Sequence, residues 1–373
     1  MAEAAAAARA MAAPWSLPAR LGAGARARLT SWSIAATLAA LGAATRLPLG
    51  GRYLFDWDSL QFALGMRRFD LAAHRPHPPG YVGYVAAGKV LAGLLGGDAN
   101  RGLVWLSGVA EAATIAGIFL VAERLWGRFA GLAAAALMLS SPLFWMYGET
   151  ALTYGLEPGL ALLGFWLVWR AVGAGGRGLA VAALVIGLVG AIRPSTEFFL
   201  LPLLALGVWL AGHDQASPPW PGRPAARLLS VVGGLAAGTL VWLVPLLALS
   251  GGPVAYLAAS AALAHRVSGG SAIWRAGSGG LLLDARAVFD GLAYSLGLYL
   301  PLAAGALVAA RLAPARWPAP GGGGRRFGRP GTARTRRPVP LGTAETRRPV
   351  PLGTAGTRRL VLLGTAWALP ALL

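Results

Sequence analysis

Eight strongly apolar segments, many of them flanked by arginine, constrain the fold of this chain more than any other feature. A bilayer crossing needs about 20 mostly apolar residues, and backbone groups in lipid must be hydrogen-bonded internally, so each segment predicts a helix. The chain is 56% hydrophobic and 13% charged, which is typical of a polytopic membrane protein rather than of a soluble domain. The predicted spans are 29–44, 102–122, 129–147, 158–169, 178–192, 197–211, 228–249 and 288–310.

The net charge of +19 at pH 7 lies beside these apolar segments rather than on one basic face. We interpret it as the positive-inside signature of a membrane protein and not as a nucleic-acid site. Residues 1–28 are then predicted to be a disordered basic tail in the cytoplasm. Segment 29–44 is predicted to be an uncleaved anchor, with a cleaved signal peptide as the alternative, and the loop 46–101 is placed outside. Cysteine is absent, so we expect no disulfide and no thiolate metal site.

Residues 78–96 are also apolar, and whether they cross the membrane sets the side of every later loop. If they form an interfacial helix on the outer surface, the arginines near 124–128, 170–177 and 223–227 all fall inside the cell. If they cross, the same arginines fall outside. We therefore predict that 78–96 does not span. The external loop 46–101 is itself basic, which this rule does not explain and which an anionic substrate would.

The region 311–359 departs from the apolar pattern, because a unit of eleven residues repeats from Gly331, Gly342 and Gly353. The unit has too few large apolar residues to build a core, and proline excludes a helix in its first two copies. It predicts a disordered basic loop. Residues 360–373 begin a further apolar span, so we expect a chain truncated relative to a complete bundle.

Ionisable residues concentrate between Phe55 and Tyr84, directly after the first predicted span. Because ionisable groups cost free energy near lipid, such a cluster predicts a working site. Asp58 precedes a helix-like run over 60–69, and it suits both an N-cap and a general base whose ionised form the helix N-terminus stabilises. Asp56 is a second carboxylate, suited to act as a base or a metal ligand.

The same stretch also contains three arginines, two histidines and a third aspartate. Arg67, Arg68 and Arg75 suit bidentate hydrogen bonds to a phosphate, or else form a solvated face. His77, flanked by prolines, suits metal coordination or phosphate contact, with a plain turn histidine as the alternative. A divalent metal such as Mg or Mn would take Asp56 and His77 as ligands, and this stays open.

The loop aspartate followed by His77-Pro-Pro-Gly-Tyr81 resembles the first external loop of glycosyltransferase family 39. This family belongs to the GT-C superfamily and includes protein O-mannosyltransferases and lipid A aminoarabinose transferases. The stretches Arg124–Glu157 and Ile192-Arg-Pro-Ser195 are similar to later parts of the family. The resemblance covers 29–310 and implies an all-α, GT-C-like helical bundle with external juxtamembrane helices.

The resemblance implies an enzyme of the cell envelope that transfers a hexosyl or pentosyl group, with inversion, from a polyprenyl-phosphate donor. The acceptor is a protein, lipid or glycan at the external face of the membrane. Asp58 is the first choice for the base and Asp56 the second. The predicted substrate-binding residues are Arg67, Arg68, Arg75, His77, Tyr81, Glu149, Tyr154, Glu157 and Arg193.

The sequence departs from the family beside Glu149, where a common arginine is replaced by Gly148 and Thr150. The role of Glu149 is therefore in doubt, and a helix-start carboxylate is the alternative. Glu111 lies within a predicted span and needs a buried partner or a neutral form, so it receives no role. The rival functions are a multi-pass transporter, although no pair of similar halves is found, and an inactive fragment of the transferase.

Overall fold

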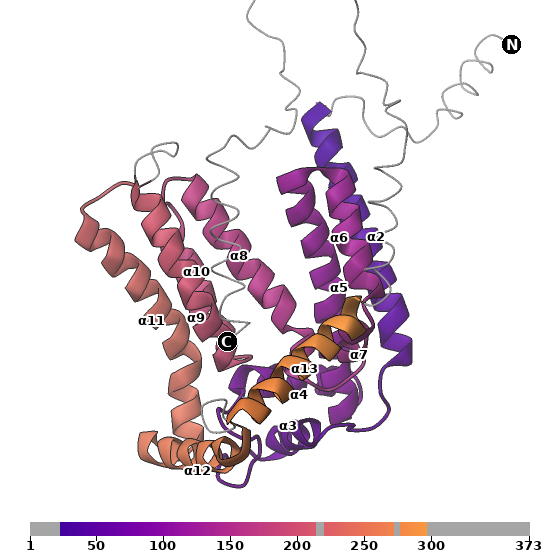
Figure 1. Ribbon diagram of the computed structural model, residues 1–373, viewed down its shortest axis with the longest axis vertical. Coiled ribbons are helices and arrows are strands. Elements are labelled where there is room, and N and C mark those ends of the chain that lie inside the picture. The colour runs from indigo at the N-terminus through magenta and orange to yellow at the C-terminus, as the bar shows by residue number, and fades with distance from the viewer. Residues whose placement is uncertain (1–22, 214–219, 272–276, 297–373) are drawn as a thin grey trace, which may run out of the picture. The chain divides into compact units, whose positions relative to one another are not determined.

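The computed structural model describes residues 23–213, 220–271 and 277–296, and residues 29–295 belong to one compact unit. Within these ranges the regular structure is entirely helical (Figure 1), which confirms the predicted all-α class. The α-helices are α2 (Ala23–Arg46), α3 (Trp57–Arg67), α4 (Val82–Leu94), α5 (Ala99–Trp126), α6 (Arg128–Ser140), α7 (Pro142–Gly148), α8 (Glu157–Gly173), α9 (Leu179–Val189), α10 (Pro194–His213), α11 (Pro224–Leu249), α12 (Pro253–Ser271) and α13 (Gly277–Leu296). Two 3₁₀ turns, η1 (Leu47–Leu49) and η2 (Thr153–Gly155), connect them. The predictions for 1–22, for the part of the span 288–310 that follows residue 296, for the repeats of 311–359 and for 360–373 lie outside the described residues.

Three described helices, α5, α10 and α11, are long and apolar enough to cross a membrane, and the bent pair α6 and α7 would make a fourth. These helices support a multi-pass membrane protein. The predicted spans 158–169 and 178–192 correspond to α8 and α9, whose 17 and 11 residues are short for a crossing. Helix α4 has 13 residues and rises about 20 Å, which agrees with the prediction that 78–96 does not span.

The predicted single span 129–147 is wrong in detail, because helices α6 and α7 are bent by 65° at a break between them. The break follows from Pro142, which has no backbone N–H and disfavours helical geometry in the preceding residue. Ser141 accordingly has φ −67° and ψ 118°, and its side chain caps α7 by accepting from the backbone N–H of Phe144. By contrast, Pro202 and Pro245 lie inside α10 and α11 without ending them.

Two further boundaries differ from the predictions. Helix α2 begins at Ala23, six residues before the expected start of the first span, so the disordered tail does not extend to residue 28. It contains five hydroxyl side chains between Thr30 and Thr45 and is not among the candidate spans. Helix α13 begins at Gly277 rather than near residue 288, with Asp284, Arg286 and Asp290 inside it, and it too is not a candidate span.

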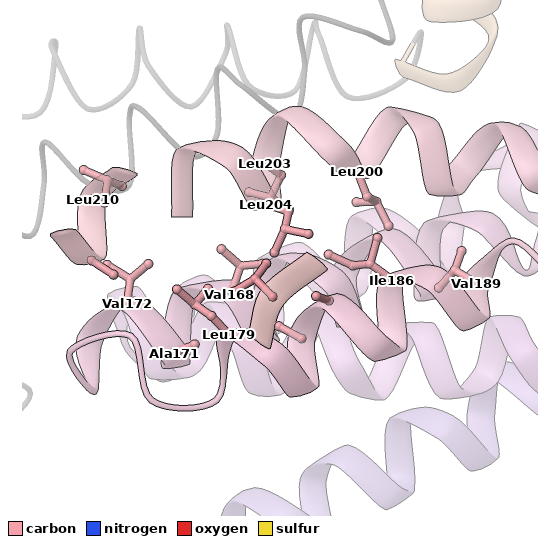
Figure 2. Close-up of a cluster of buried hydrophobic side chains, with 14 residues drawn as sticks. Val168, Ala171, Val172, Leu179, Ile186, Val189, Leu200, Leu203, Leu204 and Leu210 are labelled. Carbon is pink, nitrogen blue, oxygen red and sulfur yellow. The ribbon is translucent and has the colours of Figure 1, made fainter. Parts of the chain in front are cut away.

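The largest core cluster joins α8, α9, α10 and the middle of α11 (Figure 2). Leucine, valine and isoleucine side chains such as Val168, Ile186 and Leu203 are fully buried in it. Helices α9 and α11 approach closely at Gly187, where an added Cβ would lie 2.5 Å from the carbonyl oxygen of Leu235. Trp242 of α11 also donates to the Gly187 carbonyl at 2.8 Å. This four-helix assembly fixes the start of α10, where part of the site lies.

Besides a small cluster of Leu71 with Trp242 and Leu246 of α11, two smaller clusters complete the frame of the site. One packs α3 and α4 against α5 and the segment 151–156, with Phe62 and Tyr84 among its buried side chains. The other packs α2 against α5, α6 and α7 through Ala35, Ile115 and Phe144. Helix α5 belongs to both clusters, so it links the loop region after α2 to the turn that follows α7.

Candidate functional site

The start of α3 places the two predicted carboxylates in different roles. Asp56 is the N-cap, with extended backbone angles, and its Oδ1 accepts a 2.8 Å hydrogen bond from the backbone N–H of Asp58. The interpretation of Asp58 as the N-cap is therefore wrong, because the helix begins at Trp57, two residues earlier than an N-cap at Asp58 would place it. The Asp58 side chain lies in the first turn, is 37% exposed, and does not cap the helix.

Asp58 lies beside His77, which comes from the proline-rich segment before α4. Asp58 Oδ1 and His77 Nδ1 are 3.6 Å apart, and the buried Nδ1 has no hydrogen-bond partner. Burial lowers the pKa of His77 below its usual 6.5, while Asp58 opposes the shift and His74 and Arg193 add to it. Because burial outweighs the attraction of the carboxylate, the pair is better described as a carboxylate beside a neutral imidazole than as an ion pair.

Tyr81 continues this row of side chains on the other side of the imidazole. Its hydroxyl lies 3.3 Å from His77 Nε2, and burial raises the pKa of Tyr81 to about 12, so the phenol stays protonated near neutral pH. If the phenol donates to Nε2, the imidazole proton lies on Nδ1 and faces Asp58. The Phe62 ring, 5.6 Å from His77 and 5.1 Å from Tyr81 between ring centres, packs against both.

The backbone around these side chains is unusual. Tyr81 has φ +46° and His74 has φ +54°, in the left-handed region that bulky residues rarely occupy. Such conformations persist only where the surroundings impose them, and they gather at functional sites. At Tyr81 the ring contacts with Phe62 and His77 supply that constraint.

Arg193 brings a positive charge to the same place from the turn before α10. Its Nε lies 2.7 Å from Glu157 Oε1, its Nη1 donates to Thr153 Oγ1 at 3.0 Å, and its guanidinium lies 4.4 Å from the centre of the Tyr154 ring. Burial opposes the charge, but Glu157, Tyr154 and Tyr81 together raise the pKa of Arg193. The positive charge of Arg193 also lowers the pKa of both His77 and Tyr81.

Six of the predicted site residues therefore gather into one group, which we call the loop cluster. Its members are Asp58, His77, Tyr81, Tyr154, Glu157 and Arg193. They come from three segments far apart in the sequence: the start of α3 with the loop to α4, the turn η2 before α8, and the turn before α10. The cluster combines a partly exposed carboxylate, a neutral imidazole and a guanidinium, which suits proton transfer beside an anion.

The other predicted site residues lie elsewhere. Arg67 and Arg68 are exposed at the end of α3, and Arg75 is exposed with its backbone paired to Asp70 at 2.7 and 2.8 Å. No side-chain hydrogen bond or ion pair is found for these three arginines in the described part of the chain. Glu149 follows α7, where burial raises its pKa and Arg46 opposes the shift.

The structure also contains a buried pair of ionisable residues, Arg46 and Glu111, that the sequence did not predict as a pair. Arg46, the last residue of α2, and Glu111, within α5, are both fully buried, and Arg46 Nε lies 2.7 Å from Glu111 Oε2. Arg46 also donates to Thr45 Oγ1 and to the carbonyl oxygen of Leu139, and its guanidinium lies 5.6 Å from the Phe144 ring centre. Glu111 thus has the buried partner that its position in an apolar helix requires, and Arg46 is engaged within the protein.

The predicted metal ligands were Asp56 and His77. The carboxylate that lies beside His77 is that of Asp58, while the carboxylate of Asp56 is engaged as the helix cap. In the ranges that the structure describes, no group of three or more His, Cys, Asp or Glu side chains is placed to hold a metal ion. Sequence reasoning also missed Phe62 and Thr153, because an apolar residue and a neutral residue give no sign of a site in the sequence.

Comparison of the chain with protein-family models, with curated proteins and with solved structures finds no match.

Proposed function

We propose that this protein is a membrane glycosyltransferase of the GT-C type, similar to family 39, that uses a polyprenyl-phosphate-linked sugar. The observation that supports the proposal best is the position of Asp58. Its carboxylate is partly exposed, is not used as a helix cap, and lies 3.6 Å from the buried imidazole of His77. A carboxylate with access to solvent, held beside a neutral imidazole and a nearby arginine, suits a general base that works next to a phosphate.

In the proposed reaction, Asp58 takes the proton from the acceptor hydroxyl group, whose oxygen attacks the anomeric carbon of the sugar. The bond between that carbon and the phosphate oxygen breaks, and polyprenyl phosphate leaves with the electron pair. His77 and Tyr81 position Asp58 through the row of side chains described above. Arg193 adds positive charge near the departing phosphate, while Glu157 and the Tyr154 ring hold the guanidinium in place.

The test uses the full chain in proteoliposomes, with a panel of polyprenyl-phosphate-linked sugars and release of polyprenyl phosphate as the readout. We expect Asp58→Asn to lower turnover by about 10²–10⁴-fold, which is the usual contribution of general-base catalysis. Asp56→Asn is the matched control, because asparagine caps a helix about as well as aspartate, and turnover should stay near that of the unmodified chain.

The two outcomes that would contradict the proposal are distinct. Near-normal turnover in Asp58→Asn would remove this residue as the base while leaving the substrate class intact. Absence of turnover by the unmodified chain with every donor in the panel would instead overturn the substrate class. The same proteoliposomes report the rival transporter function, since uptake without release of polyprenyl phosphate would favour it.

A further inference from the structure

A cavity of about 580 Å³ lies apart from the loop cluster, between the segment that follows α2 and the first two turns of α5. None of its lining residues belongs to the loop cluster. Its volume falls in the range of small-molecule sites, roughly 300–1,000 Å³. Arg52, Arg101, Asn100 and Trp105 supply its functional side chains, and η1 and the following glycines form the facing wall.

The wall of this cavity is held firmly on both sides. Asn100 Nδ2 donates to the carbonyl oxygen of Gly51 at 2.7 Å, and the backbone N–H of Gly51 donates to the carbonyl oxygen of Glu149 at 2.8 Å. At Gly50 an added Cβ would lie 2.7 Å from Val104 Cγ1, so this wall approaches α5 as closely as a glycine permits. The cavity is therefore a built feature of the fold, fixed to α5 and to the turn after α7.

One buried polar atom of the wall lacks a partner. The bond from Asn100 Nδ2 to Gly51 fixes the orientation of the amide, and Asn100 Oδ1 is then buried with no hydrogen-bond partner. Because this oxygen is sealed from solvent, it does not face the cavity, and the choice of ligand rests on the charges of the wall.

The charges of the cavity favour an anion. Arg52 and Arg101 are exposed, and no ion pair is found for either in the part of the chain that the structure describes. Asp98 contributes one carboxylate, whose Oδ1 accepts from the backbone N–H of Arg101, so the side chains sum to one positive charge. The Arg101 guanidinium lies 5.9 Å from the centre of the Trp105 ring, which limits its freedom.

We infer that this cavity binds a phosphate ester. The guanidinium groups of Arg52 and Arg101 line it and supply charge-assisted donors for phosphate oxygens. Such a group occurs in a soluble polyol phosphate and in the headgroup of a glycerol phospholipid. The inference is independent of glycosyl transfer, and it gives a role to two of the basic residues of the loop 46–101, Arg52 and Arg101.

The test is calorimetric titration of the purified full chain with glycerol 3-phosphate. We expect saturable binding to one site, weakened about tenfold in Arg101→Gln and in Arg52→Gln, because each removes a charge-assisted hydrogen-bond donor. Arg128→Gln is the matched control, since it removes the same charge from an exposed arginine paired with Glu123, and binding should be unchanged.

A second arm separates the two sources of the ligand. The chain is placed in nanodiscs of phosphatidylcholine with or without phosphatidylglycerol, and its melting temperature is measured. Stabilisation by phosphatidylglycerol that is lost in Arg101→Gln and kept in Arg128→Gln, without binding of the soluble ester, identifies a lipid headgroup and supports the inference. Absence of both effects, or an equal loss in Arg128→Gln, would overturn it.

Discussion

Two sets of ionisable side chains in the described part of the chain, the Arg46–Glu111 pair and the loop cluster, differ in how their charges are paired. Arg46 and Glu111 are fully buried, 2.7 Å apart, and Arg46 has further partners on neighbouring segments. In the loop cluster Asp58 is partly exposed and 3.6 Å from His77, whose Nδ1 has no hydrogen-bond partner. The Arg46–Glu111 pair is buried and hydrogen-bonded within the protein, so a ligand cannot reach it. The Asp58 carboxylate is partly exposed and can exchange a proton with a ligand.

The difference also lies in what each group connects. The Arg46–Glu111 pair joins the end of α2 to the middle of α5, and the Arg46 bond to the Leu139 carbonyl adds the end of α6. The loop cluster joins segments that lie outside the candidate spans. We therefore expect the buried pair to govern stability and the loop cluster to govern activity, and four variants test this separation from the largest expected effect on stability to the smallest.

Breaking the buried pair should have the largest effect. Arg46→Met leaves Glu111 buried without its partner, and we expect a loss of about 3–5 kcal/mol in unfolding free energy, measured by unfolding of the full chain in detergent. The double variant Arg46→Met/Glu111→Met should lose much less, because neither charge remains. Arg128→Met breaks an exposed pair with Glu123 and should cost at most about 1 kcal/mol. Equal losses of unfolding free energy in Arg46→Met and Arg128→Met would contradict the expectation that the buried pair governs stability.

Crowding the Arg46–Glu111 pair should have the next largest effect on the free energy of unfolding. A Cβ at Gly148 would collide with the Glu111 carboxylate, with Arg46 Cδ 3.2 Å away. Gly148→Ala should therefore cost about 1–3 kcal/mol, as overpacking of a core usually does. Gly93→Ala is the control, since nothing lies within 4 Å of the added methyl group in α4, and it should be neutral or slightly stabilising. A neutral Gly148→Ala would mean that the pair has room to move.

Removing the cap beneath the loop cluster should have a smaller effect on stability. Asp56→Ala removes the acceptor for the backbone N–H of Asp58, and we expect a loss of about 1 kcal/mol in thermal unfolding of the full chain. Asp56→Asn keeps an acceptor and should retain the stability of the unmodified chain. If both substitutions cost the same, the charge of Asp56 rather than its capping bond would be what matters.

The pH response of the loop cluster should be the smallest effect. The pKa of His77 is lower in the folded protein than its usual 6.5, so the unfolded chain binds the additional proton more readily. The contribution of His77 to the free energy of unfolding is fully present above about pH 6.5. It is lost as the pH falls from there towards the pKa of His77 in the folded protein. The melting temperature should therefore drop between pH 7.5 and 5.5, and by less in His77→Gln. His265→Gln, at an exposed histidine of α12, should retain the full drop.

The apolar pattern predicted most of the helices, because the requirement to bury or shield apolar side chains is written locally in the sequence. It did not predict the break between α6 and α7 or the early starts of α2 and α13. At Ser141-Pro142 a local rule ended the helix inside an apolar run, while Ala23–Arg28 and the first part of α13 are too polar for an apolar criterion to include them.

For the site, the sequence by itself determined that ionisable residues gather in 55–84 and which residue types were available there. It did not decide which aspartate caps α3, since both lie near its start and a shift of two residues in that start would exchange their roles. Only the tertiary structure joined Arg193 to Glu157, brought the charge of Arg193 to act on His77, and joined Arg46 to Glu111 across 65 positions of sequence. Such pairings depend on how helices pack against one another, and side-chain packing between distant segments leaves no periodic signal in the chain.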